Sequence, residues 1–428
     1  MDLSPIDQLV ESGKIDRAFY YLHKYEALHP DSPKVTLYLG NTYNRTNNWH
    51  EAERYYRKTI RLNPEDIVAY THLESILRLQ RRYHECRELL TSVERMSPGL
   101  SKVIDTSIAM LDLGDGNLGS GFRGFENRFE FSHMRLAYKE QWFPRWDGMK
   151  RIKGKRILIR YEQGLGDTIQ YARYSDSLKS LGASQVDIFC KQALTRLLKC
   201  VPGMDSTYSE RPPGPYDFEV MLMSLPALLG TSLESDIPGG TYIAVDPKDS
   251  ALWANKIPNN GKLKVGLVWS GELKKGLKSW EAERMNTMRS IPLEQWRPIL
   301  DVPCDYYSLQ KGEKQHDLDD FSAVSPIIDL MNDVNDFYDT ACIIDNLDMV
   351  IAVDTSTAHL SGALGKETWM LNRYDGCWRW MRDRSDTPWY DSMQIFNQTE
   401  FLEWYGPLNN VATQLQEVNN KKRAEARL

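Results

Sequence analysis

The chain of 428 residues is long enough for two or three domains, each able to bury a core of its own. Its 41% hydrophobic and 26% charged residues are typical of globular proteins and exclude wholesale disorder. The net charge of −6 provides no general attraction to nucleic acid or to an anionic membrane, although a local basic cleft stays open as an alternative.

The cysteines and the first residues indicate a compartment. No two cysteines form a C-x-x-C pair, which favours free thiols in a reducing compartment over a zinc site (Cys86, Cys190, Cys200, Cys304, Cys342 and Cys377). The first residues, MDLSPIDQLVE, lack the basic and apolar regions of a signal peptide. No apolar run approaches the ~18 residues that a membrane span requires. We therefore expect a cytoplasmic protein.

Residues 1–112 are predicted to form helical repeats with a period of 34 residues. Prolines, small residues and large residues each recur at this step (Pro30, Pro64 and Pro98; Ala18, Ala52 and Cys86; Leu22, Tyr56 and Leu90). With Leu39-Gly40 and Tyr43 in the best copy, the pattern resembles the tetratricopeptide repeat. Small residues let two helices approach, and the proline ends the second helix. A generic helical bundle is the alternative, which the exact proline spacing disfavours. Such arrays usually present a concave surface to a peptide or another domain.

Residues 113–150 are predicted to form a connector. Leu113–Gly121, with the sequence LGDGNLGSG, is glycine-rich and predicts a turn or hinge. The stretch that follows is aromatic and basic, with seven large rings (Phe125, Phe129, Phe131, Tyr138, Trp142, Phe143 and Trp146). Such rings could stack on bases or sugars, but binding of single-stranded nucleic acid also requires a basic groove. A packed interdomain connector is the favoured interpretation.

A first α/β domain is expected over residues 151–258. Ile157–Ile159 predicts a strand, and Tyr161–Thr168 predicts a glycine-punctuated loop that leads into a helix. The loop lacks the third glycine of the dinucleotide fingerprint. Its glycines, Gly164 and Gly166, allow close backbone approach to a ligand and place Asp167 at the mouth of a cleft. An ordinary helix-capping role for Asp167 is the alternative, and Glu162 is a second nearby carboxylate.

A second α/β domain is expected over residues 259–395. Val265–Trp269 predicts a strand that ends in a candidate phosphate loop, Ser270-Gly271. The next segment is charged and favours a solvated loop (Lys274, Lys275, Lys278 and Arg284). Arg289 lies just before Pro292, which suits the first turn of a helix. A further strand, Tyr306–Leu309, ends in Gln310 and Lys311.

The segment LDMVIAVDTSTAHLSGALGK, residues 347–366, contains the most informative pattern. Met349–Val353 predicts a buried strand, Asp354–Thr357 predicts a helix N-cap, and His359 falls in the first helical turn. A strand that enters the amide end of a helix is where α/β proteins hold phosphate. A capped strand-turn-helix with a structural histidine is the alternative. The repeated alternation predicts two doubly wound parallel sheets facing across a cleft, followed by a C-terminal helix and charged tail at 396–428.

Five segments then carry a resemblance. RILIRYEQGLGDTIQYARY, VGLVWSG, RSIPL, SLQKG and VDTSTAHLSGALGK occur in the order seen in bacterial and phage-type tetratricopeptide-repeat glycosyltransferases. The catalytic half resembles the heptosyltransferases, glycosyltransferase family 9, of GT-B fold. WDG at Trp146–Gly148 and WRW at Trp378–Trp380 also fit the repeat-bearing group. Residues 272–288 depart from the pattern as a long insertion.

The resemblance implies an inverting, metal-independent transfer from a nucleotide sugar, with no cofactor besides this donor substrate. Asp167 would be the general base toward the acceptor hydroxyl. His359 would contact the phosphates or the nucleotide, Asp354 the donor sugar or ribose, and Gln310 and Lys311 would line the nucleotide pocket. The predicted nucleotide-sugar-binding set is completed by loop and helix-start residues (Gly164, Gly166, Ser270, Gly271, Arg289, Thr355, Ser356 and Thr357). A retaining outcome stays open.

A metal site and two other functions are the alternatives to a metal-independent glycosyltransferase. The D-x-D pattern at Asp317–Asp320 binds manganese in other transferases, but it falls in a charged stretch that favours a solvated loop. A non-catalytic peptide-binding scaffold with a degenerate transferase region predicts loss of the charged site residues, which are present. An enzyme acting on modified nucleic-acid bases is disfavoured by the net acidity. The repeats are expected to select the acceptor, a protein, glycan or other hydroxyl-bearing molecule. The sequence names neither the donor nor the acceptor.

Overall fold

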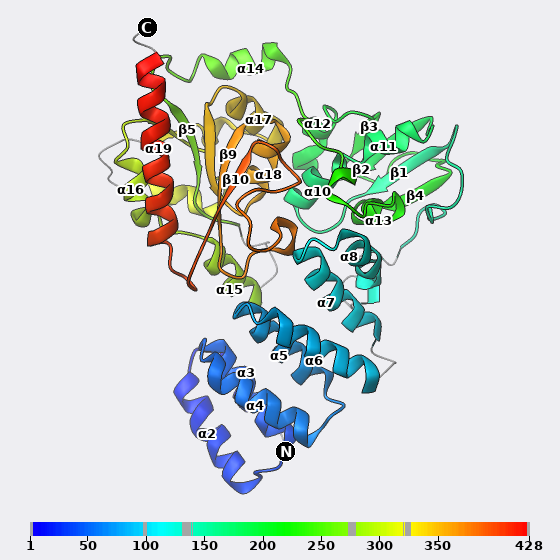
Figure 1. Cartoon of the computed structure of the whole chain (residues 1–428), viewed down its shortest axis with the longest axis vertical. Coiled ribbons are helices and arrows are strands. Elements are labelled where there is room, and N and C mark those ends of the chain that lie inside the picture. The colour runs from blue at the N-terminus through cyan, green and yellow to red at the C-terminus, as the bar shows by residue number, and fades with distance from the viewer. Residues whose placement is uncertain are drawn as a thin grey trace. The chain divides into compact units, whose positions relative to one another are not determined.

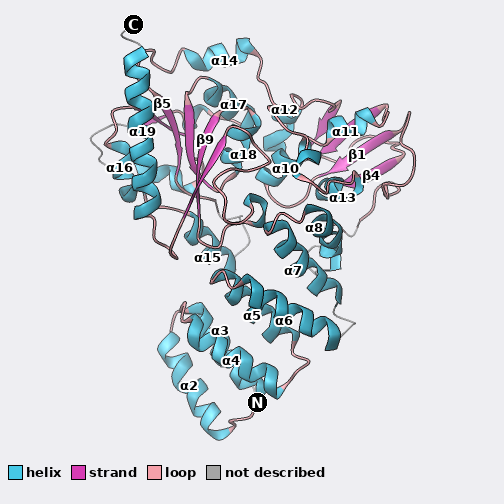
Figure 2. Cartoon of the chain, viewed as in Figure 1, coloured by secondary structure: helices cyan, strands magenta, loops and turns pink. Residues whose placement is uncertain are grey.

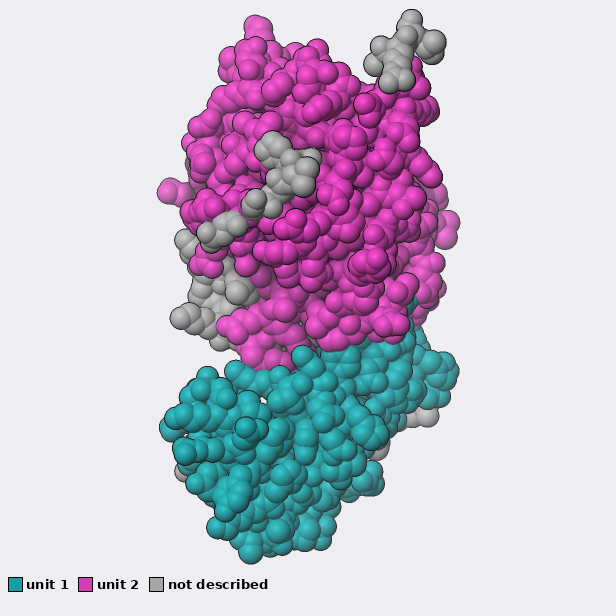
Figure 3. Space-filling view, turned by 90° about the vertical axis from the view of Figure 1, so that its left-hand side faces the viewer, with its two compact units in different colours: residues 1–111 teal, residues 112–428 magenta. Residues whose placement is uncertain are grey.

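The computed structural model describes residues 3–96, 101–130, 138, 140–272, 280–319, 321 and 327–425. It divides into two units, Met1–Leu111 and Asp112–Leu428, coloured teal and magenta in Figure 3. Within the described ranges, no helix is both long and apolar enough to cross a membrane. Several residues that the sequence singles out lie outside these ranges (Pro98, Phe131, Lys274, Lys275, Lys278 and Asp320).

The first unit is a series of helices, and each of the first five packs beside the next (Figure 1). They are α1 (Ser4–Glu11), α2 (Ile15–Leu28), α3 (Pro33–Arg45), α4 (Trp49–Leu62), α5 (Ile67–Leu79), α6 (Tyr83–Met96) and α7 (Ser101–Gly114), the last of which continues into the second unit. Ser32, Asn48 and Asp66 cap α3, α4 and α5, because each side chain accepts a hydrogen bond from a backbone N–H of the first turn.

The 34-residue series occupies the core of the first unit. Its small residues are fully buried, and its large residues are at most 3% exposed (Ala18, Ala52 and Cys86; Leu22, Tyr56 and Leu90). A Cβ at Gly40 would lie 2.6 Å from the Tyr56 ring, so this glycine lets α3 and α4 approach closely. Pro30 and Pro64 follow the ends of α2 and α4. The predicted tetratricopeptide-like fold of this region is confirmed.

The second unit contains two parallel sheets, magenta in Figure 2. The first has the order β3-β2-β1-β4 and consists of β1 (Arg156–Arg160), β2 (Gln185–Phe189), β3 (Ser206–Tyr208) and β4 (Phe218–Met221). The second has the order β10-β9-β8-β5-β6-β7 and consists of β5 (Lys264–Val268), β6 (Asp305–Ser308), β7 (Ile327–Asp329), β8 (Met349–Val353), β9 (Glu367–Asn372) and β10 (Met393–Asn397).

Both sheets have the doubly wound strand order. From β7, the second sheet runs through its third, second, first, fourth, fifth and sixth strands, and the first sheet contains the first four places of the same order. The order reverses between β1 and β4 in one sheet and between β5 and β8 in the other. The predicted fold class, helical repeats followed by two doubly wound sheets, is therefore confirmed.

Helices surround these sheets, with α16 and α19 on one side of the second sheet and α17 and α18 on the other (Figure 2). The helices of the second unit are α8 (Leu118–Phe125), α10 (Leu165–Ala172), α11 (Ser175–Ser180), α12 (Thr195–Leu198), α13 (Leu225–Leu228), α14 (Pro247–Ala254), α15 (Trp280–Arg289), α16 (Arg297–Leu300), α17 (Phe337–Asp345), α18 (Ser356–Ala363) and α19 (Tyr405–Glu425). Short 3₁₀ helices join them: η2 (Glu126–Glu130), η3 (Gln192–Leu194), η4 (Leu222–Ser224), η5 (Glu234–Asp236), η6 (Leu293–Trp296), η7 (Glu313–Leu318), η8 (Met331–Asp333) and η9 (Trp378–Trp380).

The predicted glycine-rich hinge at Leu113–Gly121 is wrong over most of its length. Helices α7 and α8 occupy both ends of the segment, which confines the turn to Asp115–Asn117. Gly121 lies inside α8, where a Cβ would come within 2.6 Å of the Leu113 side chain. Gly121 therefore allows close packing inside a helical segment. Glycine-rich composition alone does not distinguish such a glycine from one in a turn.

The described part of the aromatic connector packs against β4. The backbone N–H of Trp146 donates to the Glu219 carbonyl at 2.9 Å, and the Glu219 N–H donates to the Pro144 carbonyl at 2.9 Å. The Glu219 carboxylate accepts from the backbone N–H groups of Trp142 and Phe143 at 2.9 and 3.1 Å. These contacts agree with the favoured interpretation of a packed connector.

The second sheet departs from expectation after β5. The sequence predicts a helix start at Pro292 with Arg289 just before it. In the structure a helical segment does begin after Pro292, as η6 followed directly by α16, but Arg289 is the last residue of the preceding helix α15. The described end of the inserted segment, residues 280–288, is thus helical rather than a loop. Only three residues separate the end of α15 from the start of η6. The polar residues and the proline in this short segment therefore do not show, from sequence alone, that a helix also ends there.

Candidate functional site

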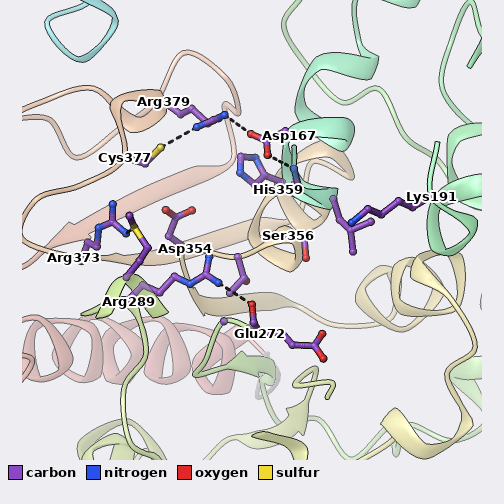
Figure 4. A pocket seen from close by; sticks show the side chains of 16 residues that line it. Asp167, Lys191, Glu272, Arg289, Asp354, Ser356, His359, Arg373, Cys377 and Arg379 are labelled. Atoms are coloured by element: carbon purple, nitrogen blue, oxygen red, sulfur yellow. Dashed lines mark hydrogen bonds and ion pairs between the residues drawn. The ribbon is translucent and has the colours of Figure 1, made fainter. Parts of the chain in front are cut away.

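A cavity of about 740 Å³ opens in the second unit at the carboxyl ends of strands from both sheets (Figure 4). The first sheet contributes the start of α10 and Lys191, which follows β2. The second contributes the ends of β5 and β8, the two strands at which its order reverses. Open α/β sheets bind ligands at such reversal points. The topology therefore places this cavity where a ligand is expected.

The structure brings most of the predicted site residues to this cavity (Gly164, Gly166, Asp167, Gly271, Arg289, Asp354, Thr355, Ser356 and His359). Four others do not line it: Ser270, Thr357, Gln310 and Lys311. The sequence had not assigned a role to six further lining residues besides Leu165 (Lys191, Glu272, Met285, Arg373, Cys377 and Arg379). Of these, only Arg379 carried a sequence signal, the WRW motif.

Gln310 and Lys311 support the wall of the cavity instead. The Gln310 Oε1 accepts hydrogen bonds from the backbone N–H groups of Trp269 and Ser270, at 3.2 and 2.9 Å, and so holds the chain where β5 ends. The Lys311 Nζ donates to two backbone carbonyls, at 2.6 and 2.8 Å (Met331 and Val334). The Ser270 hydroxyl lies 2.9 Å from that of Ser290.

Asp167 caps α10 and also lines the cavity. It stands in the first turn of α10, and its Oδ2 accepts a hydrogen bond from the Gly164 N–H at 2.7 Å, which caps the helix. Its Oδ1 forms an ion pair with the Nη2 of Arg379 (Figure 4). Because Asp167 also lines the cavity, the cap fixes a carboxylate at the place where a ligand would enter.

The two glycines before Asp167 approach protein side chains. A Cβ at Gly164 would lie 2.8 Å from the Asp167 Oδ2, and a Cβ at Gly166 would lie 2.6 Å from the His359 Cδ2. Gly166 also lies close to Ser356, at the first turn of α18. These glycines therefore let the starts of α10 and α18, which follow strands of different sheets, meet beside the cavity.

Glu162, the other candidate carboxylate, is fully buried away from the cavity. The Arg128 guanidinium donates to both of its oxygens, at 2.9 and 2.8 Å, and the Met223 N–H donates to Oε1 at 3.0 Å. A fully buried carboxylate whose oxygens are held in this way has no access to the cavity and cannot take a proton from a ligand there.

His359 is a neutral member of the cavity wall. Burial lowers its pKa to about 4, so the imidazole carries no charge at neutral pH. Its Nδ1 lies 2.9 Å from the Tyr390 hydroxyl, and its ring stacks on Trp380 at 4.8 Å between centroids. If Nδ1 accepts from Tyr390, Nε2 carries the proton and can donate a hydrogen bond. His359 can therefore offer a ligand a hydrogen bond but not a positive charge.

Arg289 and Arg373 supply positive charge from the second sheet's side. The Arg289 guanidinium donates to the Asn286 Oδ1 at 3.2 and 3.1 Å and to the Glu272 carbonyl at 3.3 Å. Among the described residues no carboxylate lies within ion-pair distance of it, and burial lowers its pKa. In contrast, the Arg373 Nε lies 2.8 Å from the Asp375 Oδ1. Arg289 is therefore a half-buried cation without a described carboxylate partner, which an anionic ligand could neutralise.

The D-x-D aspartates have protein partners. The Asp317 Oδ2 accepts a hydrogen bond from the indole Nε1 of Trp269 at 3.1 Å, and Asp319 lies 3.1 Å from His316. Within the part of the chain that the structure describes, no three His, Cys, Asp or Glu side chains are grouped to hold a metal ion. The cavity lining offers cations and the start of α18 as groups that could hold an anion.

Comparisons with known proteins bear on the whole chain. No family model matches it. It is 26% identical over 397 residues to Protein FlbA of Caulobacter vibrioides, an alignment that covers 85% of this chain but only 63% of FlbA. The chain thus spans less than two thirds of this curated relative.

Solved structures of two kinds are similar to the chain. A glycosyl transferase family 9 protein from Veillonella parvula matches 65% of this chain and 100% of its own, at 9% identity and a TM-score of 0.47. E. coli ADP-heptose LPS heptosyltransferase II matches 63% of this chain and 99% of its own, at 12% identity and a TM-score of 0.45. YrrB, a tetratricopeptide-repeat protein, matches 30% of this chain and 66% of its own, at 16% identity and a TM-score of 0.26. Both kinds of protein named by the motif resemblance are therefore among its structural likenesses.

Proposed function

We propose that this protein is a nucleotide-sugar-dependent glycosyltransferase that transfers a sugar to an acceptor hydroxyl with inversion and without a metal ion. One observation carries the proposal: the Asp167 carboxylate and an array of cations and helix-start amides line the same cavity from opposite sheets. The motif resemblance to family 9 points to the same reaction.

Asp167 is the proposed general base. The acceptor oxygen attacks the anomeric carbon, the bond to the diphosphate oxygen breaks with its electron pair, and the hydroxyl proton passes to Asp167. A carboxylate is a weak base, so the proton leaves as the new bond forms and not before. The burial of Glu162 in its pair with Arg128 supports the choice of Asp167 over Glu162.

The second sheet's side is the proposed site of the diphosphate. Negative charge gathers on the leaving group in the transition state, and fixed amides and cations stabilise it. The first turn of α18, with Ser356 at its start, offers backbone amides and the positive end of a helix. Arg289, without a described carboxylate partner, and the Gly271 backbone lie in the same wall. The neutral His359 supplies a hydrogen bond and no charge.

The repeats are proposed to hold the acceptor. The repeat helices bury the 34-residue series, and α2 leaves Tyr20 and Tyr21 at the surface, where they are 65% and 44% exposed. Exposed rings on a helical array suit contacts with an extended peptide or a glycan.

Donor binding is the first test. A thermal-shift panel of UDP-, GDP-, ADP-, CMP- and dTDP-sugars should raise the melting temperature with one base, because a ligand that binds only the folded state stabilises it by mass action. The stabilising donor is then incubated with acceptor fractions, and the anomeric configuration of the product is determined. A panel with no stabilising nucleotide or nucleotide sugar would contradict the proposal, and a retained configuration would contradict inversion.

A further inference from the structure

The base proposed above is fully occupied in this structure. Asp167 uses Oδ2 to cap α10, through the hydrogen bond from Gly164, and uses Oδ1 to pair with Arg379. The cap is part of the helix start and would persist while α10 is intact. Oδ1 is therefore the oxygen that an acceptor hydroxyl would use, and Arg379 covers it.

Arg379 is held at its backbone and contacted on several sides of its guanidinium. The Trp389 indole donates to the Arg379 carbonyl at 2.8 Å, and the guanidinium carbon lies 4.2 Å from the centre of the Trp378 ring. Its Nη1 lies 3.2 Å from the Cys377 sulfur, and its Nη2 also donates to the Gln163 Oε1 at 3.3 Å.

The same guanidinium has unused hydrogen-bonding capacity beside the cavity. Its Nε is buried without a hydrogen-bond partner, although Arg379 lines the cavity together with Arg289. Burial opposes its charge, but the attraction of Asp167 outweighs this and raises the pKa of Arg379. The cation therefore stays charged and can exchange one anionic partner for another.

We propose that Arg379 is a positioning residue that couples the two substrates: it pairs with Asp167 while the cavity is empty and shifts to the donor diphosphate when the donor binds. The shift uncovers Oδ1 of Asp167 for the acceptor hydroxyl. Asp167 and the diphosphate thus compete for one cation. This inference rests on the proposed function, because it takes the anionic ligand to be the donor diphosphate.

The other groups around Asp167 cannot take this role. His359, on α18, is neutral, and Tyr171, on α10 itself, is a buried phenol whose pKa is raised by burial. Cys377, on the loop after β9, contacts Arg379 through its sulfur. Of the cations that line the cavity, Arg379 is the one whose ion pair with Asp167 the structure records.

A double-mutant cycle with inorganic pyrophosphate as the probe tests the competition. Asp167→Asn keeps an oxygen for the helix cap but removes the charge that binds Arg379, so pyrophosphate should bind about tenfold more tightly, as expected for the loss of one close charge pair. Arg379→Gln should weaken pyrophosphate binding about tenfold. In the Arg379→Gln background, Asp167→Asn should change the affinity less than about twofold. Titration calorimetry measures all four affinities.

Two outcomes overturn the inference. Equal tightening by Asp167→Asn in both backgrounds means that the carboxylate repels anions directly, without competition for Arg379. No tightening in the wild-type background means that the ion pair is not exchanged. Arg384→Gln is the matched control, because Arg384 pairs with Glu234 and Asp386 and does not line the cavity. It should leave pyrophosphate affinity within about twofold.

A conservative variant covers the case in which Arg379→Gln does not fold. Arg379→Lys keeps the charge but loses the planar guanidinium that lies over Trp378, so pyrophosphate affinity should fall by less than in Arg379→Gln, and the tightening by Asp167→Asn should persist. Normal affinity with no tightening in this variant overturns the inference. Pyrophosphate binding requires no transfer reaction. A failed cycle in an enzyme that transfers sugar would refute only the coupling, and a successful cycle without transfer from any donor would refute only the proposed function.

Discussion

The two walls of the cavity differ in the chemistry that they supply. The wall from the first sheet consists of the α10 start and Lys191, and it holds the carboxylate proposed as the base. The wall from the second sheet holds Arg289, Arg373, Arg379 and the amides at the start of α18. In the proposed reaction, the first wall would accept a proton and the second would stabilise an anion. A group-transfer site needs both, so neither sheet is a site without the other.

Removing the charge of the proposed base should have the largest effect on the reaction. Asp167→Asn is expected to lower turnover about a hundredfold or more, because no other cavity carboxylate occupies the base position. Circular dichroism and the melting temperature should stay close to wild type, since the amide can still cap α10. Turnover is measured with the donor identified by thermal shift. Wild-type turnover in the variant would refute the assignment of Asp167.

The buried imidazole of the second wall should make stability depend on pH. The folded pKa of His359 is about 4, below the value of about 6.5 expected when unfolded, so its contribution is present above pH 6.5 and is lost as the pH falls toward 4. Between pH 7 and pH 5 the free energy of unfolding should fall by about 2 kcal/mol from this group. Urea unfolding of wild type and His359→Gln at both pH values measures the difference. An equal decrease in both proteins would contradict the buried neutral state.

A larger side chain at Gly166 tests whether the two walls of the cavity must approach closely. Gly166→Ala places a methyl group within 2.6 Å of His359, so it should destabilise the protein by about 1–3 kcal/mol and weaken nucleotide-sugar binding. Gly239→Ala is the control, because its Cβ would meet its nearest atom at 3.9 Å with no unusual backbone angle. Denaturant melts compare the two variants. Equal stabilities would mean that α10 and α18 are not held together at this contact.

Removing positive charge from the second wall should weaken anion binding. Arg289→Ala is expected to reduce nucleoside diphosphate affinity about tenfold, and Lys256→Ala, at a surface pair with Asp333, should not. Titration calorimetry measures both.

Activity should also persist in EDTA. Loss of activity in EDTA that manganese restores would overturn the metal-free mechanism and return attention to Asp317 and Asp319.

Deleting the repeats should impair transfer to the acceptor but not binding of the nucleotide sugar. Because α7 runs through Gly114, removal must stop before it, and deletion of residues 1–96 leaves this helix whole. We expect nucleotide-sugar affinity to change less than about threefold, while transfer to the natural acceptor falls about tenfold. Parallel loss of both in a folded protein would mean that the repeats support the catalytic unit itself. Full transfer to the acceptor would mean that they recognise something else.

Local patterns in the sequence were sufficient for several elements of this fold. The 34-residue series marks helix contacts because a residue that touches the neighbouring helix recurs at the same place in each repeat. The apolar run Met349–Val353 is the strand β8, and the polar residues after it begin α18. Such features depend on periodicity and capping, which act within a few turns of chain. The same reasoning failed for Leu113–Gly121, because composition does not separate glycines in a turn from glycines that let helices touch.

Only the tertiary structure decided which side chains share the cavity. Asp167 and Arg379 are more than two hundred residues apart, and their pairing depends on how two sheets meet. The sequence named Asp167 as the candidate base and Glu162 as a second nearby carboxylate, and only the structure shows that Glu162 is buried beside Arg128 while Asp167 lines the cavity. The sequence also singled out His359 but did not predict that its imidazole is neutral. Desolvation depends on the atoms packed around the ring and not on its neighbours in the chain.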